Sequence, residues 1–345
     1  MNWDIYKENF IHEAKKHHKN ENYIKKWLEY AYNLNSKKLP IIYDQNHLCE
    51  LIGFDKNYVY AISNGGKHFY RTFEIKKKNG GTRTIHEPLP NLKDIQRWIL
   101  KNILDYVEVS PYAKAYRKGY SVKDNVKFHR RQKKVLCLDI HSFYDSLKSN
   151  LVLDVFIELG YKNDVAIMLT NLCCLDYKLP QGAPTSSSLS NIIMRKFDYS
   201  VSDFCRNNAI RYTRYADDMT FSGDFDEINV IRFIRNELKK INLRLNNQKT
   251  KVRIQGQQQL ITGIVVNEKT QLPKKKRKEI RQTMYYIKKY GINEHMNFKN
   301  IDKSYYLEHI MGVVNYGLFL NPKDSELIAY RSILQVLKKS QDNKT

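Results

Sequence analysis

The amino-acid sequence predicts an α+β fold in which helices back a small antiparallel sheet. Val135–Asp139 is an apolar run that ends in an acid, as expected of a buried strand. Ile210–Tyr215 alternates in the manner of a strand, and Met219–Gly223 can return beside it after a tight turn. The order around these segments is strand, helices, strand pair, helix and strand, which is consistent with an antiparallel sheet backed by helices.

The residues before this sheet are predicted to form helices and one hairpin. Residues 1–40 should be helical and basic, and the charge run at 15–19 is interpreted as a solvated helix face. Tyr70–Ile85 is predicted to be a two-stranded hairpin, because Asn79-Gly80-Gly81 is a favourable turn sequence. A helix should follow, since apolar residues then recur at helical spacing, namely Leu92, Ile95, Ile99, Ile103 and Tyr106.

The rest of the chain is predicted to be mostly helical. Helices are expected over residues 151–159, 165–172 and 228–238. Thr185 can cap a further helix, whose apolar face would carry Leu189, Ile192, Ile193, Phe197, Val201 and Phe204. Pro273 is well placed as the first residue of a helix. Residues 304–339 should form further helices, with one face made of Ile310, Val313, Val314 and Leu318.

Size and charge restrict the classes of function. The chain has 345 residues, enough for a large core and more than one lobe, and a net charge of +23 with a pI near 9.6. Such a charge favours a polyanionic partner, either nucleic acid or an acidic membrane surface. No apolar run approaches the roughly 18 residues of a membrane helix, and no signal peptide is visible. We therefore expect no membrane partner. The five cysteines show no metal-ligand spacing, and their odd number fits a reducing cytoplasm.

Two acidic positions carry the chemical argument. Asp217 and Asp218 are adjacent at the expected hairpin tip, and Asp139 ends the apolar strand. Each position alone has an ordinary explanation, because Asp is common in turns and at strand ends. Together they match phosphoryl transfer by two metal ions, in which hard divalent cations such as Mg²⁺ offset the repulsion between carboxylates. The protein then contributes positioning and charge stabilisation rather than covalent catalysis.

With both positions in view, the chain resembles a reverse transcriptase, and more narrowly the bacterial retron type. Six blocks fall in the family's order: Asn125–His129, Asp139, Leu179–Ser186, Tyr215–Asp218, Leu243–Thr250 and Ile261–Ile264. The likeness runs from about Tyr70 to the C-terminus. Three departures are small, since Val126 replaces the family's Ala, Ser187 replaces Pro, and Ile261 replaces Val.

The resemblance implies a right-hand polymerase fold and an RNA-directed DNA polymerase. Residues 1–40 would be an N-terminal helical extension, 41–134 the fingers, 135–272 the palm with interleaved fingers segments, and 273–345 the thumb. The enzyme would copy a cognate structured non-coding RNA into single-stranded DNA, giving a branched RNA–DNA product (msDNA). Two Mg²⁺ ions, for which Mn²⁺ can substitute, would support nucleotidyl transfer from dNTPs.

The resemblance also implies roles at the reacting centre. Asp139, Asp217 and Asp218 would bind the metals, with the Ile140 carbonyl as an additional oxygen. Lys249 would donate a proton to the leaving pyrophosphate, and a surface lysine is the alternative.

A second group of residues would hold the incoming nucleotide. Tyr144 lies where the family has an aromatic sugar gate that selects dNTPs, and a plain core aromatic is the alternative. Gln181 and Gly182 would line the nucleotide pocket, because Gly allows close backbone approach and Gln both donates and accepts hydrogen bonds. Lys76 and Arg83 resemble fingers residues that grip the triphosphate, against the alternative of an exposed basic hairpin.

A third group would contact nucleic acid. Asn125 and His129 resemble a retron element that helps to recognise the cognate RNA, although a helix-cap contact is an equal explanation. Residues 274–290 contain eight Lys and Arg against one Glu, and we read them as the first thumb helix. Its residues that grip template–primer phosphates would be Lys274, Lys275, Lys276, Arg277, Lys278 and Arg281.

Partners and alternatives follow from the same resemblance. The chain would act in the bacterial cytoplasm on its cognate non-coding RNA and the cDNA, in anti-phage defence, with a separate effector protein of unknown identity. Because the chain is expected to end with the thumb, a host RNase H would remove RNA. The alternatives are a group II intron-like, diversity-generating or abortive-infection reverse transcriptase, a DNA-templated polymerase, and a catalytically silent RNA-binding scaffold. The intact acids argue against the scaffold.

Overall fold

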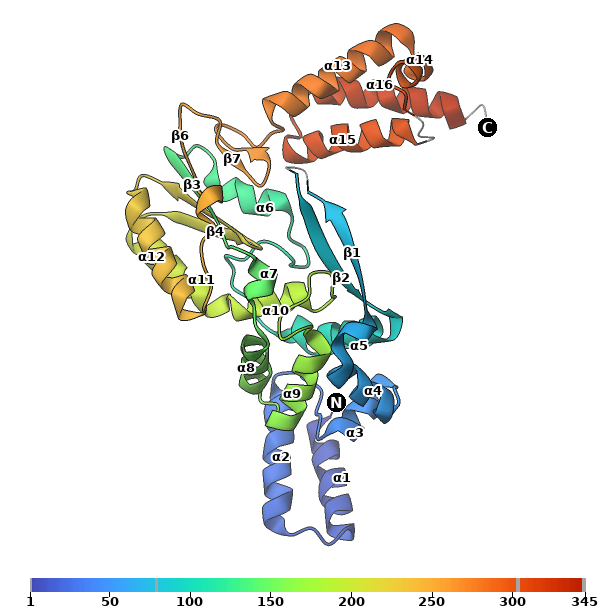
Figure 1. Cartoon of the computed structure of the whole chain (residues 1–345), viewed down its shortest axis with the longest axis vertical. Coiled ribbons are helices and arrows are strands. Elements are labelled where there is room, and N and C mark those ends of the chain that lie inside the picture. Colours follow the sequence, from blue (N-terminus) through green and yellow to red (C-terminus); the bar gives the residue numbers. More distant parts are fainter. Residues whose placement is uncertain (1, 78–79, 302–304, 343–345) are drawn as a thin grey trace. The chain divides into compact units, whose positions relative to one another are not determined.

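The computed structural model describes residues 2–77, 80–301 and 305–342 (Figure 1). The chain folds into two compact units, each assembled from segments that are separate in the sequence. The first unit comprises Met1–Lys118, Ile140–Asp203 and Ile231–Asn246. The second unit comprises Gly119–Asp139, Phe204–Val230 and Asn247–Thr345.

A four-stranded antiparallel sheet forms the centre of the second unit. Its strands lie in the order β4 (Arg211–Tyr215), β5 (Asp218–Gly223), β3 (Lys134–Asp139) and β6 (Lys251–Ile254). β3 and β5 are the two inner strands, and their apolar side chains Val135, Leu136, Leu138, Met219 and Phe221 are almost completely buried. The predicted strand and hairpin are therefore confirmed, as is the α+β class.

Short elements and four helices complete the second unit. α6 (Val122–Val126) and the 3-10 turn η3 (Lys127–His129) precede the sheet, and β7 (Leu260–Ile261) pairs with β8 (Ile264–Val265) after it. The helices are α13 (Lys274–Tyr290), α14 (Ile292–Phe298), α15 (Tyr306–Leu320) and α16 (Ser325–Asp342). Apolar residues of these helices share one core cluster with Ile261, Ile264, Val126 and Val135. Pro273 is the residue before α13 rather than its first residue, a difference of one position.

The first unit is mainly helical and contains one hairpin. β1 (Tyr70–Lys76) and β2 (Thr82–Pro88) pair antiparallel, which confirms the predicted hairpin, although Asn79 of its turn lies outside the described residues. The helices are α1 (Trp3–Lys16), α2 (Glu21–Ser36), α3 (Gln45–Ile52), α4 (Lys56–Gly65), α5 (Pro90–Asn102), α7 (Phe143–Ser146), α8 (Ser149–Leu159), α9 (Asn163–Cys173) and α10 (Ser186–Ile193), with the 3-10 turns η1 (Gly66–Phe69) and η2 (Leu104–Tyr106).

Two further helices each begin in a segment of one unit and end in a segment of the other. They are α11 (Arg195–Asn207) and α12 (Glu227–Lys240), and the 3-10 turn η4 (Asn247–Lys249) precedes β6. The single helix predicted after Thr185 is in fact two helices, α10 and α11. Met194, with φ −75° and ψ −2°, is the one residue between them.

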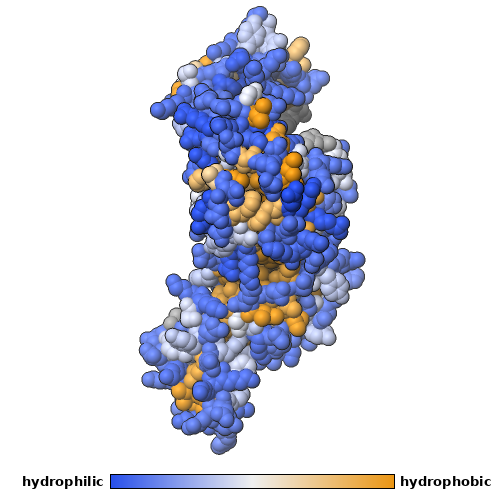
Figure 2. All heavy atoms as spheres, turned by 90° about the vertical axis from the view of Figure 1, so that its left-hand side faces the viewer, coloured by the Kyte–Doolittle hydropathy of each residue, from blue (hydrophilic) through white to orange (hydrophobic). Residues whose placement is uncertain are grey.

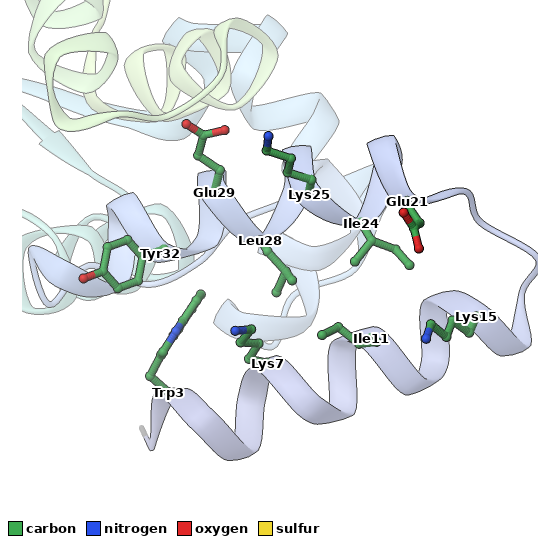
Figure 3. Close-up of a pocket in the computed structure, with 10 residues that line it drawn as sticks. All are labelled: Trp3, Lys7, Ile11, Lys15, Glu21, Ile24, Lys25, Leu28, Glu29 and Tyr32. Atoms are coloured by element: carbon green, nitrogen blue, oxygen red, sulfur yellow. The ribbon is translucent and has the colours of Figure 1, made fainter.

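The α1–α2 pair in the first unit has two different faces. On one face, Tyr6 and Phe10 of α1 meet Trp27 and Tyr30 of α2 around Tyr43 in a set of ring contacts. On the other face lies an open groove of about 620 Å³ (Figure 3). Its apolar residues are Trp3, Ile11, Ile24, Leu28 and Tyr32, and its charged residues are Lys7, Lys15, Glu21, Lys25 and Glu29.

The surface is largely hydrophilic. On the face drawn in Figure 2, polar residues predominate and apolar residues gather in a few patches. Among the described residues, no helix is both long enough and apolar enough to cross a lipid bilayer.

Two glycines of α15 give a matched test of packing in the second unit. A Cβ atom at the buried Gly317 would lie 2.5 Å from Leu327 Cδ1 and 3.0 Å from Leu272 Cδ1, whereas one at the exposed Gly312 would meet nothing within 4 Å. We expect Gly317→Ala to lower the free energy of unfolding by about 1–3 kcal/mol through overpacking. Gly312→Ala should raise it by up to about 1 kcal/mol, because Ala favours a helix. Urea unfolding of both variants measures this, and equal effects would contradict the packing.

Candidate functional site

The acidic hairpin is a tight two-residue turn at the end of the sheet. Tyr215 pairs with Asp218 across β4 and β5, so Ala216 and Asp217 form the turn between them. Ala216 adopts a left-handed conformation with φ 58°, which is uncommon for a residue with a side chain. On the other side of β5, Asp139 pairs with Asp218. The register of two strand pairs therefore gathers Asp139, Asp217 and Asp218 at one end of the strands.

A buried arginine braces this turn, and the sequence analysis missed it. Arg214 is 0% exposed, and its Nη1 donates a hydrogen bond to the carbonyl oxygen of Ala216 at 3.0 Å. One signal was present in the sequence, because the strand alternation places Arg214 on the same face as Ile210 and Tyr212, both of which are buried. A cation on an apolar strand face indicates a buried polar contact.

Lys249 neutralises the most buried of the three acids. Its Nζ donates to Asp139 Oδ2 at 2.8 Å, and the Asp139 side chain is only 5% exposed. Burial disfavours the charged lysine, but the hydrogen bond to Asp139 and the nearby negative charges outweigh it and raise the pKa of Lys249. Lys249 therefore keeps its proton beside the carboxylates.

The pKa of Asp218 reports the crowding of negative charge. Loss of hydration, and then the charges of Asp217 and Asp139, raise this pKa to about 6, while Lys249 and Lys251 act in the opposite direction. Asp218 remains exposed at the surface, so we expect water to reduce the shift. The upward direction of the shift follows from the loss of hydration and from the like charges around Asp218.

The donor set is of the kind that hard divalent cations prefer. Mg²⁺ commonly takes one or two carboxylates and completes its coordination with water and substrate phosphate oxygens. Asp139 and the Asp217-Asp218 turn offer carboxylate oxygens from neighbouring strands. Within the described ranges, no group of three or more His, Cys, Asp or Glu is arranged as a ready metal site.

Two of the nucleotide-pocket candidates of the first unit, Gln181 and Gly182, lie on a constrained loop. The carbonyl oxygen of Gln181 accepts a hydrogen bond from the His86 amide of β2 at 2.8 Å. Gly182 has φ 126°, and a Cβ atom there would lie 2.9 Å from the His86 carbonyl oxygen, so only glycine fits this approach. Tyr144 is half-buried, and its hydroxyl lies 3.5 Å from Ser187 Oγ.

Other predicted residues of the first unit have simpler surroundings. Lys76 and Arg83 are exposed next to the turn of the β1–β2 hairpin, where they pair with Thr82 and Ile75 respectively. The Ile140 side chain is buried, and its backbone bridges to Leu245.

Asn125 and His129 are inaccessible, which corrects the expected contact with RNA. Both side chains are 0% exposed. His129 bonds to Thr213 of β4 and Ser222 of β5, and Thr213 bonds to Asn125. These groups are turned into the sheet, so neither side chain can touch a nucleic acid in this structure.

The basic residues of α13 divide into two sets. Arg277 forms ion pairs with Asp324 and Glu326 at the start of α16, and Arg281 pairs with Glu326 at 2.7 Å. These two arginines therefore hold α13 against α16, which the sequence analysis did not foresee. Lys276 forms an exposed ion pair with Glu279. In the part of the chain that the structure describes, no acidic partner is seen for the exposed Lys274, Lys275 and Lys278.

Comparison with known proteins agrees with these features. The family described as reverse transcriptase (RNA-dependent DNA polymerase) matches residues 75–279. The retron Ec86 reverse transcriptase of Escherichia coli is 33% identical over 272 residues, which cover 77% of this chain and 81% of that protein. The retron Mx65 reverse transcriptase of Myxococcus xanthus is 30% identical over 284 residues, which cover 76% of this chain and 64% of that protein.

Among solved structures, the likeness is weak. Telomerase from Candida albicans in complex with a TWJ fragment of telomeric RNA aligns over 84% of this chain and 68% of that chain. The two are 12% identical with a TM-score of 0.47, which is too low to carry an argument.

The raised pKa of Asp218 has a consequence for stability. A carboxyl group whose pKa is higher in the folded chain contributes stability that is complete below about pH 4 and is lost as the pH rises through about 6. We therefore expect Asp218→Asn to stabilise the metal-free protein by about 1 kcal/mol at pH 7.5, after allowance for solvent exposure, and by less at pH 4.5.

Urea unfolding in EDTA at both pH values measures this difference. Asp224→Asn is the control, because a hydrogen bond from Lys133 lowers the pKa of Asp224, so that variant should not gain stability at pH 7.5. An Asp218→Asn effect that is the same at both pH values would contradict the charge crowding.

Proposed function

The chain belongs to the retron reverse transcriptases, and we propose that it copies its cognate structured non-coding RNA into single-stranded DNA that stays joined to RNA by a branch. It is an RNA-directed DNA polymerase of the right-hand α+β class. The observation that carries the proposal is the register that brings Asp139 beside the Asp217-Asp218 turn, with Lys249 bonded to Asp139.

We propose that Asp139, Asp217 and Asp218, with the Ile140 carbonyl, hold two Mg²⁺ ions, for which Mn²⁺ can substitute. When bound, the ions would activate the attacking hydroxyl and neutralise charge on the leaving pyrophosphate. Lys249 holds the Asp139 carboxylate in place and keeps its own proton, so it can supply that proton to the leaving group.

The proposed nucleotide contacts lie in the first unit. Gln181 and Gly182 would line the pocket, where the backbone approach at Gly182 keeps the wall close to β2. Tyr144 would contact the sugar and exclude a 2′-hydroxyl, and Lys76 and Arg83 would bind the triphosphate. Support comes from the family membership and from the exposure of the two hairpin cations.

The proposed division into parts follows the family. Residues 41–134 would form the fingers, 135–272 the palm with interleaved fingers segments, and 273–345 the thumb. By the same reasoning, the bacterial cytoplasm would be the location, dNTPs the substrates, and a host RNase H and a separate anti-phage effector the partners.

The branched product gives the direct test of this function. The chain should be purified from its native host with its bound nucleic acid, which is then treated with RNase and with DNase. We expect a short DNA that remains attached to a piece of RNA until the 2′–5′ branch is cleaved. RNA without attached DNA would overturn the retron activity.

Removing the acidic turn should separate synthesis from RNA binding. We expect the double variant Asp217→Asn and Asp218→Asn to reduce DNA synthesis by about a thousandfold or more, because the metal-binding carboxylates are removed. RNA affinity should stay within about threefold, since few phosphate interactions change. Primer extension and filter binding measure the two quantities, with Asp224→Asn as the control. A fall in RNA affinity as large as the fall in synthesis would contradict the assignment.

The two sets of basic residues on α13 should behave differently. Changing Lys274, Lys275 and Lys278 to Ala should flatten the plot of log affinity for an RNA–DNA hybrid against log salt, by about 0.7–0.9 for each phosphate that the protein no longer neutralises. The matched control removes three lysines of the first unit, Lys15, Lys16 and Lys19, and should leave the slope nearly unchanged. Equal slopes in both triple variants would mean that the α13 lysines are merely solvated.

A further inference from the structure

We propose that Asn125, His129, Thr213 and Ser222 form a positioning network that fixes the acidic turn for catalysis. The inference rests on the proposed function, because it assigns these residues an effect on DNA synthesis. It replaces RNA recognition as the role of Asn125 and His129. None of the four would touch substrate or metal, so each acts through the strands that carry Asp217 and Asp218.

The network is a continuous chain of short hydrogen bonds. His129 Nε2 lies 2.8 Å from Thr213 Oγ1, and His129 Nδ1 lies 2.7 Å from Ser222 Oγ. Thr213 Oγ1 donates to Asn125 Oδ1 at 2.7 Å. All four residues are buried, with Thr213 the most exposed at 2%. Imidazole thus links the two strands of the hairpin.

The single proton of the Thr213 hydroxyl constrains the direction of these bonds. A hydroxyl has one proton, and that of Thr213 goes to the amide oxygen of Asn125. Thr213 Oγ1 can therefore accept from an N–H group at His129 Nε2. His129 Nδ1 forms the second bond of the ring, to the Ser222 hydroxyl. The chain of bonds from Ser222 to Asn125 is unbroken, while Asn125 Nδ2 has no hydrogen-bond partner among the described residues. A rotation of either strand would break at least one of these bonds.

The placement of the network in the hairpin explains why the turn would respond. Thr213 lies four residues before Asp217, and Ser222 lies four residues after Asp218, in strands that are paired along their length. Imidazole therefore fixes the twist and register of the two strands just behind the turn. Small shifts here should therefore move the carboxylates at the turn. Catalytic rates are sensitive to displacements of about 1 Å, so such shifts should lower the rate of synthesis.

The segment that supplies Asn125 and His129 is itself anchored on both sides. Ser121 and Asp124 form a capping box that starts α6. The Phe128 carbonyl accepts from Arg211 of β4 at 2.7 Å, and Lys123 Nζ donates to the Phe319 carbonyl of α15 at 2.9 Å. Val126 belongs to the core cluster that includes α15. The network thus connects the hairpin to a fixed support rather than to a mobile loop.

The experiment uses three threonine variants of the full chain. Thr213→Val keeps the shape of the side chain but removes both of its network bonds, and Thr213→Ser restores the hydroxyl. Thr220→Val is the matched control, because Thr220 is the cross-strand partner of Thr213, is equally buried at 2%, and lies outside the network. Ser222→Ala is a second network variant, for use if Thr213→Val does not fold.

Synthesis on poly(rA) with an oligo(dT) primer gives the catalytic readout. We expect Thr213→Val to lower kcat by about 10- to 100-fold, while the KM for dTTP and the Kd for RNA stay within about twofold. Thr213→Ser should recover kcat to within about threefold of wild type, and Thr220→Val should leave it nearly unchanged. Ser222→Ala should change kcat in the same direction as Thr213→Val.

Two results would overturn the positioning role. A loss of RNA affinity with kcat retained would return these residues to RNA recognition. A fall of kcat in Thr220→Val as large as in Thr213→Val would show that any disturbance of the buried strands has the same effect.

Hydrogen exchange of the hairpin separates this inference from the proposed function. Peptides covering residues 212–223 should exchange at least about tenfold faster in Thr213→Val than in Thr220→Val. This measurement does not depend on enzymatic activity. If the wild-type protein had no polymerase activity, the proposed function would be refuted, but the exchange rates would still test the network. Equal exchange in the two variants would refute the network itself.

Discussion

The second unit must hold three carboxylates close together, and much of its structure serves that requirement. Asp139 is nearly buried, so its charge needs a partner, and the Lys249 ammonium provides one at 2.8 Å. The sheet adds rigidity, because β5 is paired on both sides and cannot shift away from β3. Loss of hydration, together with the repulsion that remains, raises the pKa of Asp218. Because the carboxylates of this site repel one another, bound cations would stabilise it.

Two different devices keep the acidic turn in place. Arg214 acts from within the hairpin, where its guanidinium holds the Ala216 carbonyl, and the His129 ring acts from behind, where it bonds both strands. The first fixes the backbone of the turn, and the second fixes the strands that lead to it. Both use buried polar groups, whose directional bonds define a single geometry more strictly than apolar packing would.

Local patterns in the sequence predicted the elements, whereas partners distant in sequence decided the roles. The strand that ends at Asp139 and the hairpin around Asp217 were predictable, because apolar runs and turns are local signals. Burial of His129 was not, since it depends on Thr213 and Ser222, which are more than eighty positions away. In the same way, the charge run of α13 could not reveal that Arg277 is engaged by Asp324 and Glu326. The burial of Arg214, by contrast, follows from the strand alternation that places it beside Ile210 and Tyr212.

The assembly of the second unit from three separate segments has a consequence for how the chain folds. β3 cannot pair until β5 has been synthesised, and β6 joins later still, after residue 250. The helices α1 and α2, by contrast, are close in sequence and can pair early (Figure 1). Pairings between distant segments form slowly, because closing the long intervening loop costs conformational entropy before the new contacts stabilise the pairing. The four-stranded sheet should therefore be among the last parts of the protein to form.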